Sequence, residues 1–193
     1  MRALDATVDY IRSKYPEIFL IADAKRGDIG NTAKMYAKAF FEEMDFDAVT
    51  IAPYMGADSV TPFLEYKDKW AIVLALTSNA SAYQFQNAQK DGKPLYQAVM
   101  EEMMEISTPD NMMFVVGATK ADKLQELRSF CPDNFFLVPG VGAQGGSAEE
   151  VIANGSNEYG GLLINSSRGI LFADSTENYA KVAGEVAAQT ANL

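Results

Sequence analysis

The sequence predicts an α/β fold, in which short apolar strands alternate with amphipathic helices. Three observations support this class: six apolar runs have the length of buried strands, a helical pattern follows each run, and polar or glycine-rich residues stand where the runs end. Strands are expected at residues 18–22, 48–52, 71–76, 112–116, 135–138 and 161–165. Helices are expected at residues 1–14, 31–44, 57–66, 93–106, 120–129, 147–153 and 176–190.

The residues after the strands distinguish between two arrangements of these elements. An open, doubly wound sheet places its ligand at one switch point, whereas a barrel gathers every strand end around one mouth. Site-like residues follow nearly every strand here, for example Thr77-Ser78-Asn79 and Ser166-Ser167-Arg168. The sequence therefore favours a TIM-type (β/α)8 barrel, with about six of the eight βα units in this chain. We expect residues 1–193 to form a single barrel domain.

The composition restricts the compartment and the partners. The net charge is −10 and no dense Lys/Arg cluster is present, which argues against nucleic acid or an anionic membrane surface as a partner. No apolar run approaches the roughly 20 residues that span a bilayer, and the first residues do not read as a secretory signal. The single cysteine, Cys131, fits a reducing compartment. We therefore expect a cytoplasmic protein.

The chain contains no histidine, which restricts its chemistry. Histidine is the commonest general base and a usual zinc ligand. Proton transfer must then use Lys, Asp, Glu or Tyr, and no metal site is expected.

Four charged residues follow the first predicted strand: Asp23, Lys25, Arg26 and Asp28. Alternate side chains of a strand share a face, so Asp23 and Lys25 should lie together and Arg26 should point away. Asp28 comes three residues later, and a carboxylate, ammonium, carboxylate array at the rim of a sheet indicates a catalytic site. The alternative is a solvated loop, in which Asp28 or Asn31 caps the following helix.

Two later segments suit an anionic ligand. The glycine-rich segment 139–147 follows one strand and opens a helix, so its free N–H groups suit phosphate, although a plain tight connection is the alternative. Arg168, after the next strand, offers paired cationic donors, and Gln144 offers a neutral one. Earlier in the chain, Thr77-Ser78-Asn79 is either a helix cap or a set of hydrogen-bonding groups for a polar heterocycle.

Six motifs in this order resemble the orotidine 5'-phosphate decarboxylase family, in particular its longer bacterial-type (type 2) subfamily. They are DAKRGDIGNTA, APYMGADSVTPFL, LALTSNASAYQFQ, VVGATKADKLQELR, VPGVGAQGG and INSSRGILFA, and together they cover nearly the whole chain. The resemblance implies a homodimeric (β/α)8 barrel that uses no cofactor. It implies conversion of orotidine 5'-phosphate to UMP and CO2 in pyrimidine biosynthesis.

The resemblance also implies roles for individual residues. Asp23 resembles the carboxylate that crowds the carboxylate of the substrate, and Lys25 resembles the ammonium that protonates C6. Asp28 and Thr32 resemble residues that reach the site of the neighbouring subunit. The remaining substrate-binding residues are Ser78 for the pyrimidine and, for the phosphate, Gln144, Gly145, Gly146, Ser167 and Arg168.

The start of the chain departs from the family pattern. Met1-Arg2-Ala3-Leu4 resembles the family helix that follows the second strand, and the family's first two strands carry an Asp and a Lys that complete the site. We therefore expect an N-terminally incomplete barrel with little or no turnover by itself. Two alternatives stay open: a magnesium-dependent sugar-phosphate decarboxylase or synthase of a related barrel family, and a non-catalytic truncated barrel.

Overall fold

The computed structural model describes residues 2–118, 121–141 and 147–191. The chain divides into two compact units. The first unit consists of Met1–Leu74 and Lys90–Met113, and the second of Ala75–Gln89 and Phe114–Leu193.

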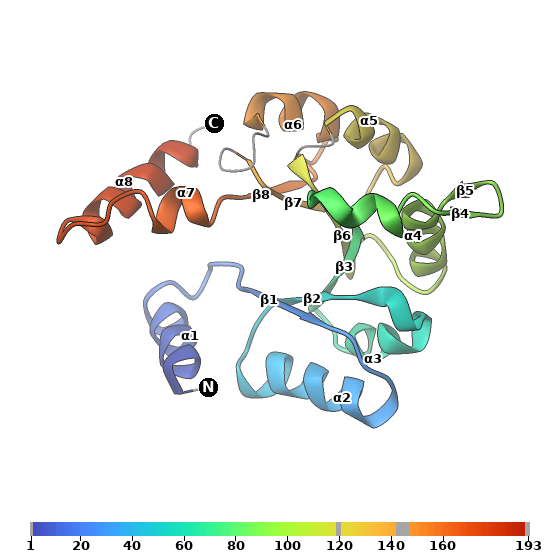
Figure 1. Cartoon of the computed structure of the whole chain (residues 1–193). Helices are drawn as coiled ribbons and strands as arrows, with labels where there is room; N and C mark the ends of the chain where they lie inside the picture. The colour runs from blue at the N-terminus through green and yellow to red at the C-terminus, as the bar shows by residue number, and fades with distance from the viewer. Residues whose placement is uncertain (1, 119–120, 142–146, 192–193) are drawn as a thin grey trace. The chain divides into compact units, whose positions relative to one another are not determined.

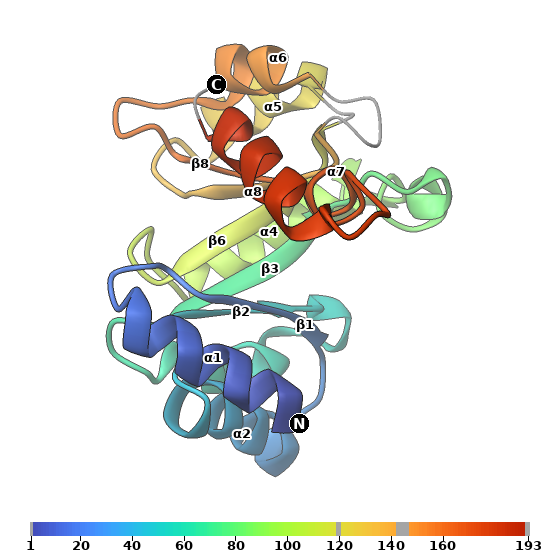
Figure 2. The same cartoon turned by 90° about the vertical axis from the view of Figure 1, so that its left-hand side faces the viewer.

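The first unit is built on parallel strands with helices on one side. Helices α1 and α2 lie on the same side of β1 and β2 in both views (Figures 1 and 2). Strand β2 pairs in parallel with β1 and with β3. The elements of this unit are α1 Arg2–Lys14, β1 Ile21–Arg26, α2 Gly30–Lys38, the π-helix η1 Ala39–Glu43, β2 Ala48–Ile51, the 3-10 helices η2 Pro53–Met55 and η3 Ala57–Ser59, α3 Thr61–Leu64, β3 Trp70–Leu76, β5 Lys93–Pro94 and α4 Leu95–Glu105.

The second unit repeats this βα pattern. Strand β7 pairs in parallel with β6 and with β8, and α5 packs beside α6 (Figure 1). Strands β3 and β6 each begin in the first unit and end in the second, and the order along the sheet is β1-β2-β3-β6-β7-β8. The elements are the 3-10 helix η4 Ala80–Gln84, β4 Gln89–Lys90, β6 Met112–Val116, α5 Ala121–Phe130, β7 Phe136–Pro139, α6 Ala148–Gly155, β8 Leu162–Asn165, α7 Arg168–Leu171 and α8 Tyr179–Thr190.

Aromatic side chains fill the core of the first unit. The π-helix η1 buries Phe40 and Phe41, which follow the small buried residues Ala33 and Ala37 of α2. Phe41 meets Phe63 edge-on, with ring centroids 6.1 Å apart. Burying each of these side chains contributes about 1.5–3 kcal/mol. This packing fixes α2 beneath the strands that carry the predicted catalytic residues.

The guanidinium of Arg128 ties together the second unit. It donates hydrogen bonds to five backbone carbonyls, those of Cys131, Pro132, Asn134, Gly155 and Gly161. It also lies over the ring of Phe136, 4.0 Å from the centroid. Burial lowers the pKa of Arg128, while Cys131 and Asp133 act in the opposite direction. One half-buried side chain thus holds the end of α5, the start of β7 and the chain between α6 and β8.

The α/β class and the parallel strands are confirmed, and five of the six predicted strands match to within one residue at each end. The first strand was misplaced: β1 runs from Ile21 to Arg26, so three of the four charged residues expected after it, Asp23, Lys25 and Arg26, lie within it. The hairpin β4–β5 and the short helix α7 were not predicted, and the predicted helix 57–66 is divided into η3 and α3. In the described part of the chain, no helix is long and apolar enough to cross a membrane.

Burial of Cys131 leads to a testable pH dependence. Desolvation raises the pKa of this thiol from 9.0 to about 12, with Arg128 opposing the shift. Above pH 9.0 the thiol ionises in the unfolded chain but not in the folded one, so its contribution to stability is complete below that pH and falls as the pH rises. We therefore compare the free energy of unfolding of the unchanged chain with that of Cys131→Ala. We expect the unchanged chain to lose about 1.4 kcal/mol relative to the variant between pH 7 and pH 10. Urea unfolding of both proteins measures it, and a difference independent of pH would contradict it.

Candidate active site

Asp23 and Lys25 meet on β1. The ammonium Nζ of Lys25 lies 2.5 Å from Oδ1 of Asp23, and the two side chains are 53% and 63% exposed. An exposed ion pair of this kind contributes roughly 1 kcal/mol or less to folding. The pair is therefore a minor contributor to the stability of the fold, and both charged groups are open to solvent.

The contact does not arise from regular strand alternation. Lys25 has a φ of 46°, in the left-handed region, and the pairing of β1 with β2 shifts register between Ala22 and Arg26. The expectation that both side chains follow the pleat of a regular strand was therefore wrong, although the two groups do meet. The irregularity also leaves Arg26 apart from the pair, with its guanidinium over the rings of Tyr36 and Phe40, at 5.2 and 5.7 Å.

Thr50 of β2 completes this cluster. Its hydroxyl lies 3.0 Å from Oδ1 of Asp23, and it accepts the backbone N–H of Lys25 at 2.9 Å. Thr50 was not among the site residues predicted from the sequence. The available signal was a lone hydroxyl in the apolar run Ala48–Ala52, because a polar group in a buried strand needs a hydrogen-bond partner.

Asp28 is not part of this contact. Its Oδ1 accepts the adjacent backbone N–H of Ile29 at 2.8 Å, and its carboxylate makes no ion pair with Lys25. The capping alternative was also wrong, since the N-cap of α2 is Ile29 and no side chain caps the helix. Thr32 is exposed in the first turn of α2. A role of Asp28 and Thr32 toward a neighbouring subunit stays a prediction.

The segment after β3 forms a local hydrogen-bond network. The side chain of Gln86 accepts the backbone N–H of Thr77 at 2.9 Å and donates to its hydroxyl at 2.8 Å. Asn79 occupies the N-cap position of η4 without a side-chain cap hydrogen bond, so the helix-cap interpretation of this segment was wrong. A Cβ added to Gly117 would lie 2.8 Å from Cβ of Ser78, so the close approach requires glycine there. These contacts fix the backbone around Ser78.

Ser167 and Arg168 begin the short helix α7. Ser167 is its N-cap residue, and its hydroxyl donates to Oδ1 of Asn165 at 3.2 Å. The Arg168 side chain is exposed, and within the described residues it makes no hydrogen bond or ion pair. A cation placed in this way is available to an anionic ligand.

The predicted phosphate residues Gln144, Gly145 and Gly146 lie outside the described residues. Immediately after them, Ser147 caps α6 by accepting the N–H of Glu150. The Ser147 hydroxyl also donates to Glu149 at 2.6 Å and lowers the pKa of that carboxyl. Because Asp23 and Lys25 belong to the first unit and Arg168 to the second, a common site for all three stays a prediction.

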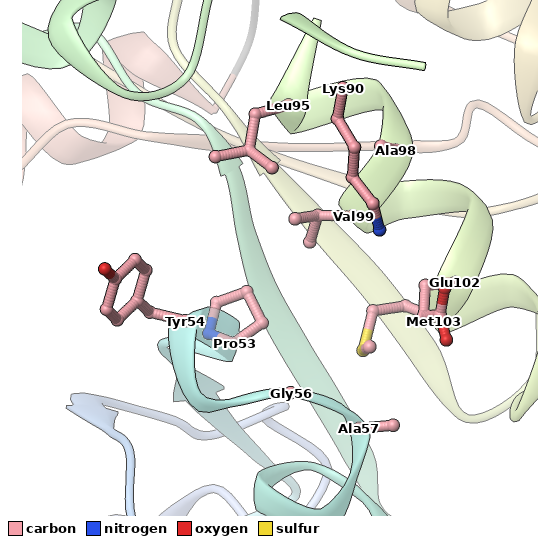
Figure 3. A pocket seen from close by; sticks show the side chains of 10 residues that line it. All are labelled: Pro53, Tyr54, Gly56, Ala57, Lys90, Leu95, Ala98, Val99, Glu102 and Met103. Carbon is pink, nitrogen blue, oxygen red and sulfur yellow. The ribbon is translucent and has the colours of Figure 1, made fainter. Parts of the chain in front are cut away.

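One pocket of the first unit contains none of the predicted site residues. It has a volume of about 320 Å³ and lies between the turn at η2 and η3 and the helix α4 (Figure 3). Figure 3 shows its side chains, which are mostly apolar: Pro53, Tyr54, Gly56, Ala57, Lys90, Leu95, Ala98, Val99, Glu102 and Met103. Among the described residues, no group of three or more His, Cys, Asp or Glu is placed to hold a metal ion.

Comparison with protein families shows the family of the chain. Residues 5–183 match the model of the Orotidine 5'-phosphate decarboxylase / HUMPS family. The chain belongs to this family. Within it, the chain is 55% identical over 186 residues to an orotidine 5'-phosphate decarboxylase of Phocaeicola vulgatus, covering 96% of this chain and 68% of that protein. A decarboxylase of Christiangramia forsetii is also 55% identical, with 95% and 67% covered.

Solved structures of the decarboxylase family agree with this assignment. A putative orotidine-monophosphate-decarboxylase from Toxoplasma gondii matches with a TM-score of 0.83 at 37% identity, over 97% of this chain and 71% of that one. The OMP decarboxylase of Leishmania donovani matches with a TM-score of 0.81 at 35% identity, covering 95% and 71%. The chain thus spans about two thirds of the length of the curated decarboxylases that it matches.

Proposed function

We propose that this chain decarboxylates orotidine 5'-phosphate to UMP and CO2 in pyrimidine biosynthesis, and that it forms about six of the eight βα units of a (β/α)8 barrel of the longer bacterial-type subfamily. The observation that carries the proposal is the contact between Lys25 and Asp23 on β1, in a chain whose family match covers residues 5–183. Relatives at 55% identity that are named orotidine 5'-phosphate decarboxylases support it.

The chemistry fits the two side chains. The bond between C6 and the carboxylate of the substrate breaks, and its electron pair stays on C6 as CO2 leaves. Lys25 then gives a proton to C6, which yields UMP, and the amine regains a proton from water. An ammonium placed in advance stabilises the negative charge on C6 more than it stabilises the starting carboxylate, while Asp23 crowds that carboxylate.

Binding energy from groups far from C6 offsets this crowding. Arg168 and Ser167, with Gln144, Gly145 and Gly146, hold the phosphate, and Ser78 contacts the pyrimidine. The exposed Thr32 and the carboxylate of Asp28 extend toward the site of a second copy in a homodimer. The reaction takes place in the cytoplasm and uses no cofactor.

Release of labelled CO2 from substrate labelled in its carboxyl group tests the function, because it detects slow turnover. We expect the chain to release CO2 and form UMP at a rate that a strong chelator leaves unchanged, since the proposed chemistry uses only side chains. We expect this turnover to be measurable but far slower than that of the Phocaeicola vulgatus relative, and a rate near that of the relative would contradict this expectation.

The same assay separates the alternatives. Loss of turnover in the chelator, restored by magnesium, would favour a metal-dependent sugar-phosphate enzyme, which the wider family name makes the second candidate. A folded chain that releases no CO2 and gives no heat on titration with UMP would support a non-catalytic barrel.

A further inference from the structure

Thr50 is a fully buried polar residue in a strand that is otherwise apolar. Its exposed fraction is 0%, and all four residues of β2 are buried. Buried hydroxyls need partners, and the two shortest of the three hydrogen bonds of the Thr50 hydroxyl join it to the proposed catalytic pair. It accepts the backbone N–H of Lys25 and lies 3.0 Å from Oδ1 of Asp23. The carbonyl of Ala22 is more distant, at 3.5 Å, so the Thr50 hydroxyl is better placed to donate its one hydrogen bond to Asp23.

The register of the strands explains why this one hydroxyl matters. Ala22 pairs with Val49 and Arg26 pairs with Ile51, so the three residues between Ala22 and Arg26 face Thr50 alone. These three residues form a bulge on β1. In a regular ladder each residue pairs with one residue of the neighbouring strand, so the backbone groups of the additional residues in a bulge need other hydrogen-bond partners. The Thr50 hydroxyl provides the hydrogen bond for the N–H of Lys25, at the residue whose φ of 46° is unfavourable for a side chain with a Cβ.

We propose that Thr50 is the positioning residue of this site: its hydroxyl holds the bulge of β1 and orients Asp23 and Lys25 for the reaction. The inference rests on the proposed function and adds a residue that does not touch the substrate. Oδ1 of Asp23 receives both the Thr50 hydroxyl and the Lys25 ammonium. This shared oxygen fixes the orientation of the carboxylate and, through it, the position of the ammonium.

Thr50→Val tests the proposal, because valine keeps the shape of threonine and removes the hydroxyl. We expect kcat to fall roughly 10- to 100-fold, since a misplacement of about 1 Å at a reacting group costs on this order. KM should change by less than about threefold, because the contacts that hold the phosphate stay intact. Thr50→Ser restores the hydroxyl and should recover most of kcat.

Ser59→Ala is the matched control. Ser59 is also 0% exposed and in the first unit, but its hydroxyl donates to the carbonyl of Gly56 rather than to a site residue. We expect its kcat to stay near that of the unchanged chain. A wild-type kcat in Thr50→Val, or an equal loss in Ser59→Ala, would overturn the positioning role.

Amide hydrogen exchange gives a readout that does not depend on turnover. In Thr50→Val the Lys25 N–H should exchange at least 10-fold faster, while the N–H groups of Val49 and Ile51 keep their rates. Unchanged exchange at Lys25 would refute the proposal even in an active enzyme. The unchanged chain could show no decarboxylation while exchange at Lys25 still becomes faster in Thr50→Val. That result would contradict the proposed function but would support the hydrogen bond from Lys25 to Thr50 as the contact that stabilises the bulge.

Discussion

Replacing Lys25 with alanine is expected to lower the turnover of orotidine 5'-phosphate by roughly 1,000-fold or more. The change removes the proposed proton donor for C6 and the proposed positive charge beside the developing carbanion, and each such role accounts for about 100-fold or more in enzymes. Release of labelled CO2 measures the loss. Affinity for UMP, measured by calorimetry, should change much less, because the phosphate contacts lie elsewhere.

Lys34→Ala provides the control for this substitution. Lys34 is an exposed lysine of α2 in the same unit, and it has no ion pair in the described part of the chain. Its removal changes the net charge by the same amount but leaves the Asp23–Lys25 pair intact. Equal turnover in Lys25→Ala and Lys34→Ala would show that Lys25 does not carry the chemistry.

Replacing Arg128 with methionine should destabilise the chain by roughly 3–5 kcal/mol. Five backbone carbonyls lose their charged donor, and each buried carbonyl left without a partner costs about 1–3 kcal/mol, part of which water recovers at a half-buried site. Methionine has an unbranched side chain that fills much of the same space. The loss in the free energy of unfolding therefore reflects the missing hydrogen bonds more than the change in side-chain volume. Urea unfolding followed by circular dichroism measures the change in free energy.

The same substitution at Arg168 is the comparison for stability. Arg168 is exposed in the second unit, and its guanidinium bonds to none of the described residues. We expect Arg168→Met to change the free energy of unfolding by less than about 0.5 kcal/mol. If both variants unfolded at the same urea concentration as the unchanged chain, the bracing role of Arg128 would be wrong.

The sequence predicted the buried strands well because their composition is unambiguous. Runs such as Met112–Val116 are apolar throughout, as strands covered on both faces are, and the structure gives this strand the predicted ends. The first strand was placed three to four residues too early, because Asp23 to Arg26 are charged and look like a loop. In the structure, the pairing of Arg26 with Ile51 extends the strand through these charged residues.

The bulge on β1 could not be predicted. A register shift depends on which residue of the neighbouring strand faces each position, and no local pattern in 21–26 encodes it. A lysine with a φ of 46° also runs against residue preferences, since glycine and asparagine are usual there. Asp23 and Lys25 were therefore predicted as a pair from the sequence, whereas Thr50 of β2, which hydrogen-bonds to both, was not.

The structure gives the chain two separate reporters of unfolding. Its one tryptophan, Trp70, opens β3 in the first unit, whereas its one cysteine is buried in the second. Indole fluorescence and thiol labelling, followed in one urea titration, therefore report on different halves of the polypeptide. Midpoints that coincide would mean that the halves unfold in a single cooperative step, and midpoints that differ would give each half its own stability.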